Sequence, residues 1–163
     1  MTFEELKFDI PNFTLHELTR TEHREYVKEN RKLEQWQADK LAHLALAFLL
    51  PIRTYFGKPM HILSGYRCKP LNLAVGSSLV SQHTLCEAAD FEIEGRTSGS
   101  GLFEVFEWIV KESELQFGQC IFELGEWIHI SVGEPYRLRT RSRQALVYKE
   151  NSDGTKGYEI YKG

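Results

Sequence analysis

The segment SQHTLCEAADFEI, residues 81–93, combines the clearest structural and chemical patterns in the chain. It places His83 seven positions before Asp90 and sets two alanines directly before the acid. The stretch AADFEI, residues 88–93, is typical of a β-strand, in which successive side chains point to opposite faces. In a continuous helix His83 and Asp90 would lie about 10 Å apart, so both can reach one ion only if the chain folds back. We therefore expect a loop that carries His83 and leads into a strand that carries Asp90.

A second strand-like stretch, WIHISV at residues 127–132, supplies another histidine. Ile128 and Ile130 flank His129, so its imidazole should point to the opposite face of the sheet from theirs. Two imidazoles and one carboxylate suit zinc, because they leave the fourth tetrahedral position for water. The candidate metal ligands are His83, Asp90 and His129. An ordinary hydrogen bond within the loop would also explain the histidine and aspartate of the first segment.

Two glutamates are candidates for a catalytic base, since a carboxylate near the metal is needed to accept a proton from water. Glu126 stands three residues before His129, and Glu123 stands six before it. In an unbroken strand Glu126 would face away from His129, although Gly125 offers a turn or bulge that could redirect it. Glu123 is the alternative base. Either glutamate could instead be a solvated residue at a strand end.

Other polar residues are candidates for substrate contacts. Arg67 could hold a carbonyl oxygen or a carboxylate where negative charge develops, or it could be a surface arginine that caps a strand. Ser64, Ser81 and Gln82 could donate or accept hydrogen bonds in the same site. The chain has neither a serine nucleophile elbow nor an H-E-x-x-H helix, which argues against a serine hydrolase or a zincin.

The rest of the chain predicts an α+β fold, with a small, mostly antiparallel sheet and helices packed on it. Pro51 should kink or end the first long helix, and Gly57 should close that region. The expected elements are a capped start at 12–20, a helix from about 33 into the fifties, a strand at 60–67, a turn or short helix at 70–78, a strand at 88–93, a helix at 102–113, strands at 118–124 and 127–132, and a terminal hairpin at 144–162.

Composition limits the class of protein. A chain of 163 residues with 42% hydrophobic content predicts one globular domain over residues 1–163. The net charge of −3 gives no basic field for nucleic acid. The start MTFEELKFDIPNF lacks the features of a signal peptide, and the longest apolar run, LALAFLLPI, is far shorter than the roughly 20 residues of a membrane span. We expect a monomer that is synthesised in the cytoplasm and does not span a membrane.

The cysteines and one arginine-rich segment limit the possible binding sites further. The three cysteines are widely spaced without a C-x-x-C pair, which excludes a four-thiolate zinc site and argues against a disulfide framework. In the run RLRTRSR the arginines alternate, so a strand would present them on one face, either to anionic polymers or as a solvated, charged edge. These arginines are Arg137, Arg139, Arg141 and Arg143.

The segments SGYRCKPLNLAVGSSLVSQHTLCEAADFEI and FGQCIFELGEWIHIS together resemble the zinc D-Ala-D-Ala carboxypeptidase-like peptidases, most closely their phage and prophage branch. The resemblance spans about residues 12–132. It implies the same α+β fold, with zinc on His83, Asp90 and His129. It places the base of the Glu-x-x-His motif on Glu126 and the conserved arginine on Arg67. Some branches carry the acid earlier, which keeps Glu123 as the alternative.

This resemblance implies a zinc metallopeptidase that hydrolyses peptide bonds in peptidoglycan stem peptides. Its activity would be of the D,D-carboxypeptidase or the L-alanyl-D-glutamate endopeptidase type, for cell-wall lysis or remodelling. Such an enzyme would reach the bacterial wall after lysis-linked release or as part of a phage particle. The alternative is a non-catalytic zinc-binding module of the same fold, and a third possibility is a metal-free protein whose histidines are core residues.

Three residues depart from the family pattern. Cys86 stands where the family usually has glycine, Cys68 stands where it usually has serine, and Ser77 stands where it often has glycine. If position 86 needs a positive φ angle, its cysteine is strained, and its thiolate is also close enough in sequence to His83 to compete as a ligand.

Overall fold

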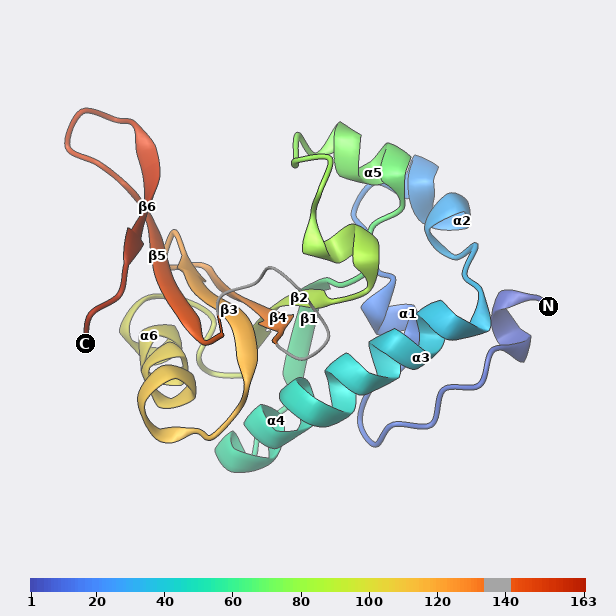
Figure 1. Cartoon of the computed structure of the whole chain (residues 1–163), viewed down its shortest axis with the longest axis horizontal. Helices are drawn as coiled ribbons and strands as arrows, with labels where there is room; N and C mark the ends of the chain where they lie inside the picture. Colours follow the sequence, from blue (N-terminus) through green and yellow to red (C-terminus); the bar gives the residue numbers. More distant parts are fainter. Residues whose placement is uncertain (134–141) are drawn as a thin grey trace.

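The described residues form a sheet of six strands with helices around it (Figure 1). The structure, a computed structural model, describes residues 1–133 and 142–163. In spatial order the strands are β1 (Met60–Ser64), β2 (Ala88–Ile93), β4 (Trp127–Val132), β3 (Phe117–Glu123), β5 (Gln144–Glu150) and β6 (Lys156–Ile160). The predicted α+β class is confirmed.

Neighbouring strands pair antiparallel at each step of this sheet except one. β3 and β5 run parallel, which sets Glu123 opposite Tyr148. The predicted strands 88–93 and 127–132 are confirmed at both ends, and the predicted terminal hairpin is the antiparallel pair β5–β6. A mostly antiparallel sheet was therefore the right expectation, but the parallel step was not predicted.

Short helical segments connect the strands. The α-helices are α1 (Leu15–Leu18), α2 (Val27–Asn30), α3 (Gln35–Leu44), α4 (Leu50–Phe56), α5 (Lys69–Ala74) and α6 (Gly99–Glu107). The 3₁₀-helices are η1 (Phe3–Glu5), η2 (Arg24–Tyr26) and η4 (Gln82–Leu85), and the π-helices are η3 (Ala45–Leu49) and η5 (Trp108–Glu112). The predicted cap is confirmed, because the Glu17 N–H donates to Thr14 Oγ1 over 3.2 Å.

The predicted long helix is formed by α3, η3 and α4 in succession, and it continues past Pro51 to Phe56. Proline lacks an N–H and its ring crowds the preceding turn, so a regular α-helix cannot be kept there. The π-helical segment η3 lies directly before α4, where it changes the hydrogen-bond pattern around the proline. Gly57 ends the helix with a left-handed φ of 61°, as expected, and donates its N–H to the Arg53 carbonyl over 3.0 Å.

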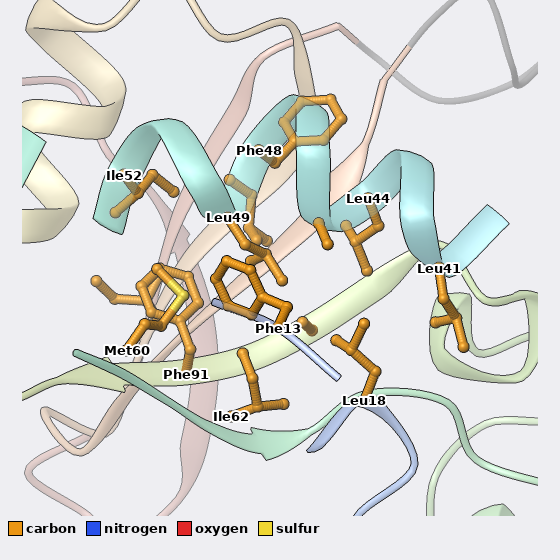
Figure 2. Close-up of a cluster of buried hydrophobic side chains, with 14 of the residues drawn as sticks. Phe13, Leu18, Leu41, Leu44, Phe48, Leu49, Ile52, Met60, Ile62 and Phe91 are labelled. Carbon is orange, nitrogen blue, oxygen red and sulfur yellow. The ribbon is translucent and has the colours of Figure 1, made fainter. Parts of the chain in front are cut away.

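One face of the sheet and this helix share the hydrophobic core (Figure 2). The helix contributes the fully buried Leu41, Leu44, Leu49 and Ile52, and the strands contribute Met60, Ile62 and Phe91. Burial of each such side chain stabilises the fold by about 1.5–3 kcal/mol. The long helix is therefore held against β1 and β2 by its apolar side.

The other face of the sheet carries the polar candidates, because successive strand residues alternate in direction. On β2, Phe91 is buried in the core and Asp90 points the other way; on β4, Ile128 and Ile130 are buried in the core around His129. None of the helices in the described ranges has both the length and the apolar character that a membrane crossing requires.

Candidate active site

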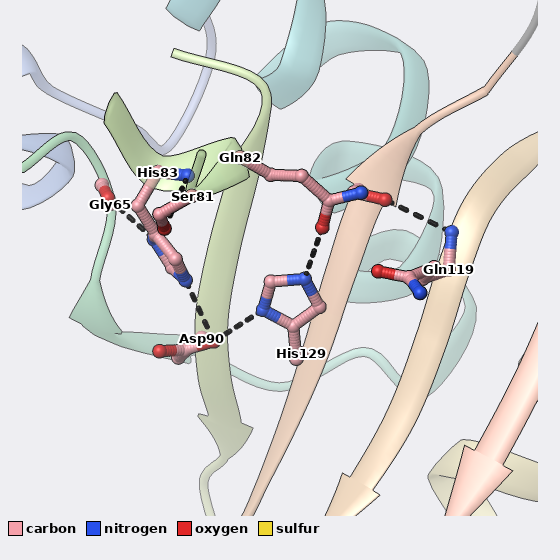
Figure 3. Close-up of polar contacts among 8 residues, drawn as sticks. Gly65, Ser81, Gln82, His83, Asp90, Gln119 and His129 are labelled. Atoms are coloured by element: carbon pink, nitrogen blue, oxygen red, sulfur yellow. Dashed lines mark hydrogen bonds and ion pairs between the residues drawn. The ribbon is translucent and has the colours of Figure 1, made fainter. Parts of the chain in front are cut away.

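Three side chains meet on this second face of the sheet (Figure 3). His83, Asp90 and His129 each offer one ligand atom, and these atoms all lie within 4.8 Å of one another. Ligand atoms about 2.0–2.2 Å from a tetrahedral zinc ion lie roughly 3–4 Å from each other. The cluster therefore has the dimensions of a metal site, and it unites the three residues that the sequence proposed as ligands.

Strand register and a short helix bring these residues together. The antiparallel pairing of β2 with β4 sets Asp90 directly opposite His129, and Asp90 Oδ1 lies 2.8 Å from His129 Nδ1. The turn η4 before β2 carries His83, whose Nε2 lies 3.3 Å from the same oxygen. The chain thus folds back between His83 and Asp90, as two ligands of one ion would require.

Each imidazole also makes a hydrogen bond through the ring nitrogen that faces away from Asp90. His83 Nδ1 donates to the Gly65 carbonyl over 2.7 Å, and His129 Nε2 donates to Gln82 Oε1 over 2.9 Å. Because these oxygens only accept, each neutral ring carries its proton on the outer nitrogen and directs a lone pair inward. Two lone pairs and a carboxylate oxygen at such short distances repel one another unless a cation or a proton lies among them. The donor set, with these outer hydrogen bonds, therefore fits zinc.

The charge of Asp90 is stabilised by the same neighbours. Burial alone would raise the pKa of Asp90. When the two imidazoles are protonated and no metal is bound, the charge of His83 and hydrogen bonds from both rings outweigh that effect and hold the pKa of Asp90 well below its usual range. Asp90 is therefore an anion at neutral pH, as a metal ligand must be.

The backbone that holds His83 requires glycine at position 65. A Cβ on Gly65 would lie 2.9 Å from the Leu18 carbonyl carbon, so Gly65→Ala must displace backbone. We expect Gly65→Ala to lower the free energy of unfolding by about 1–3 kcal/mol, measured by urea denaturation. Gly101→Ala is the control, because its Cβ would meet nothing closer than 3.7 Å on α6, and we expect it to stabilise by up to about 1 kcal/mol. Equal effects of both substitutions would contradict this account of Gly65.

The two candidate bases lie in different environments. Glu123 is at the end of β3, half-buried, and it lines the cleft around the three candidate ligands. Burial and the negative charge of Asp90 raise the pKa of Glu123, while His129 and Arg67 oppose that shift. Glu126 is exposed in the turn between β3 and β4 and lies outside the cleft lining. The geometry thus brings Glu123 to the ligand cluster and leaves Glu126, the residue of the Glu-x-x-His motif, at the surface.

Arg67 also lines the cleft. Burial lowers the pKa of its guanidinium, although the negative charges of Asp90 and Glu123 oppose that shift. Its buried Nε makes no hydrogen bond to residues in the described part of the chain. A half-buried guanidinium that lines the cleft is suited to bind a carbonyl oxygen or a carboxylate of a ligand.

Of the three residues predicted to form hydrogen bonds in the site, two line the cleft and one does not. Ser81 lines the cleft, and its hydroxyl accepts the N–H of His83 over 3.3 Å at the start of η4. Gln82 also lines the cleft, but its side-chain oxygen accepts the hydrogen bond from His129 and so orients this candidate ligand. Ser64 is opposite Asp90 in the register of β1 and β2, outside the cleft lining.

The cleft itself has a volume of about 660 Å³ and extends beyond the predicted residues. Residues of its lining that the sequence did not suggest include Val75, Gln119, Ile121, Trp127, Tyr148 and Tyr158. Gln119 and Ile121 alternate with Glu123 along one strand, and this period-two spacing could have identified them from the sequence. The tyrosines enter the cleft only through the parallel pairing of β5 with β3, which no local pattern indicates.

The buried cysteines belong to the core and lie outside the ligand cluster. Cys86 has a φ of 59°, so the strain that the sequence predicted for this position is present. Burial raises the pKa of Cys86 to about 12, so its thiol stays protonated and is a poor ligand at neutral pH.

One arginine of the predicted run, Arg143, lies among the described residues, and its role differs from both predictions. Arg137, Arg139 and Arg141 lie outside the described residues. The Arg143 guanidinium donates to the carbonyls of Leu115, Val110 and Ser113 and lies 4.7 Å from the centre of the Phe117 ring. Arg143 therefore ties β5 to the segment before β3, so it is neither a solvated edge residue nor free to bind polymers.

Two histidines and an aspartate beside a half-buried glutamate form a site typical of a metallopeptidase. The family model described as Peptidase M15 matches residues 11–131, and the chain belongs to this family of zinc-dependent peptidases. The resemblance proposed from the sequence is therefore confirmed, over nearly the span that was expected. No curated protein matches the sequence.

Proposed function

We propose that this protein is a zinc peptidase that hydrolyses peptide bonds in the stem peptides of bacterial peptidoglycan. The observation that supports this most directly is the convergence of His83, Asp90 and His129 in one cleft with Glu123 and Arg67. Membership of the Peptidase M15 family supports the same chemistry and substrate class. The bond could be of the D,D-carboxypeptidase or the L-alanyl-D-glutamate endopeptidase type, and the proposed place of action is the bacterial cell wall.

Each polar residue of the cleft has a role in this proposal. His83 Nε2, Asp90 Oδ1 and His129 Nδ1 would hold zinc, which when bound lowers the pKa of water and polarises a carbonyl. The Glu123 carboxylate accepts a proton from the attacking water and returns it to the departing amine, for which its raised pKa is suitable. Arg67 offsets the negative charge that develops on the substrate carbonyl oxygen, or holds a substrate carboxylate.

The test is hydrolysis of purified peptidoglycan together with metal analysis. We expect about one zinc per chain, new amine termini in the digest and products whose masses identify the bond that is cleaved. Zinc without hydrolysis of any stem-peptide bond would contradict the peptidase and favour the non-catalytic zinc module. Absence of zinc binding would contradict the proposed site itself.

The hydrogen bond from His129 to Gln82 makes a further prediction. Gln82→Ala removes the acceptor that orients this imidazole, and loss of such an outer partner typically weakens metal binding by about 10–100-fold. We expect this loss in a zinc titration against a chromophoric chelator. Gln119→Ala is the matched control, since Gln119 is another cleft amide but pairs with Gln144 instead. Unchanged zinc affinity in Gln82→Ala would show that His129 does not need this partner.

A further inference from the structure

The face of the sheet that carries the ligands continues without a break onto the C-terminal hairpin. Strand register places Asp90 beside His129, His129 beside Ile121, Ile121 beside Leu146, and Leu146 beside Ile160. Paired residues on neighbouring strands share a face, so this row crosses the sheet from the ligand cluster to its last strand. Its three outer members are apolar. The row therefore connects the candidate metal ligands with apolar side chains on β5 and β6.

A second row runs beside the first. It places Trp127 beside Glu123, Glu123 beside Tyr148, and Tyr148 beside Tyr158. The two tyrosine rings lie 4.5 Å apart between centroids and are tilted by 38°. Tyr158 is 58% exposed, so most of the ring is available for contact. The hairpin thus adds an aromatic pair next to the proposed base.

The apolar members of the first row and Tyr158 of the second line a groove of about 450 Å³ next to the cleft. Cleft and groove share Gln119, Ile121 and Tyr158, so they form one continuous depression. The groove lining is uncharged, and it combines apolar side chains with the hydrogen-bonded amides of Gln119 and Gln144, 2.7 Å apart. At its outer border Ile160 is 62% exposed. This surface is suited to a ligand that has amide groups and small apolar side chains but no charge.

We propose that the hairpin β5–β6 is a second substrate subsite, which binds an uncharged segment of the stem peptide next to the bond that is cleaved. This inference rests on the proposed function, because it takes the occupant of the cleft to be a stem peptide. The groove meets the cleft at Gln119, Ile121 and Tyr158, so a peptide positioned for cleavage at the ligand cluster can extend into it. The hairpin lies beyond residues 11–131, the segment that the family model matches. It is therefore a feature of this chain that can select substrates by length.

The experiment compares two synthetic peptides that contain the bond identified from the peptidoglycan digest. One is the complete stem peptide, and the other is a blocked dipeptide that contains little more than the bond itself. We expect the wild type to prefer the complete peptide in kcat/KM, and Tyr158→Ala to lower kcat/KM for it by roughly tenfold. The same variant should lower the dipeptide rate by much less, so that the preference for the complete peptide falls. Glu159→Ala is the control, because Glu159 points to the other face of β6 and pairs with Lys149.

The possible results test the substrate subsite and the proposed peptidase function separately. Loss of the length preference in Tyr158→Ala alone supports the subsite. An unchanged preference overturns it, and so does a preference that arises only when the glycan is attached, because the occupant would then be a sugar. If the peptidoglycan digest contains no cleaved stem-peptide bond, the proposed function fails. Calorimetric binding of the stem peptide to wild type and Tyr158→Ala then tests the hairpin alone, with equal affinities overturning the subsite.

Discussion

Glu123→Gln is expected to lower kcat for hydrolysis of the stem peptide by about 10²–10⁴-fold, the usual contribution of a general base. The amide keeps the size of the side chain but cannot accept the proton of the attacking water at neutral pH. Zinc content should not change, because Glu123 is not part of the ligand cluster. The measurement pairs turnover of the stem peptide with metal analysis of the same preparation.

Glu126→Gln is the matched control, since it makes the same chemical change three residues further along the chain. Glu126 is exposed outside the cleft, so we expect this variant to keep wild-type kcat. The opposite result, with loss of activity only in Glu126→Gln, would assign the base to the Glu-x-x-His position. It would also require the turn between β3 and β4 to rearrange when substrate binds.

The contrast between these glutamates shows where sequence reasoning was sufficient and where it was not. The strands that carry Asp90 and His129 were predicted to the residue, because a buried strand leaves a period-two pattern that local sequence records. The position of Glu126 depends on the turn, in which Leu124 and Gly125 have φ angles of 52° and 72°. A glycine in the sequence indicates that a turn is present. The direction of the Glu126 side chain, however, follows only from the backbone angles of both Leu124 and Gly125.

The hairpin illustrates a different limit. Its two strands and their turn were predicted from alternating residues around Ser-Asp-Gly, which is local information. Its place in the sheet is set by the pairing of β5 with β3, and side chains distant in sequence determine that contact. Tyr148 and Tyr158 could therefore be assigned to a hairpin from the sequence, but not to the cleft.

Asp90→Asn is expected to abolish specific zinc binding and, with it, both activity and the stabilisation that zinc provides. Loss of an outer partner alone weakens zinc sites by about 10–100-fold, so loss of an anionic ligand should weaken this one by more than about 100-fold. In the wild type, zinc at a thousand times its dissociation constant should stabilise the fold by about 4 kcal/mol. Thermal unfolding with zinc and with a chelator measures this difference. We expect a large rise in Tm for the wild type and almost none for Asp90→Asn.

Glu92→Gln provides the control on the same strand. Glu92 lies two residues after Asp90, and its carboxylate is 3.3 Å from His61 Nδ1, away from the cluster. It should keep the zinc-dependent rise in Tm. If Asp90→Asn also kept that rise, with wild-type zinc affinity, the ion would have to bind elsewhere. Asp90 would then serve only to pair with the two imidazoles, and the short distances around its Oδ1 would be explained by protons. Because the two explanations predict opposite responses to zinc, one pair of melting curves separates a metal site from a buried ion pair.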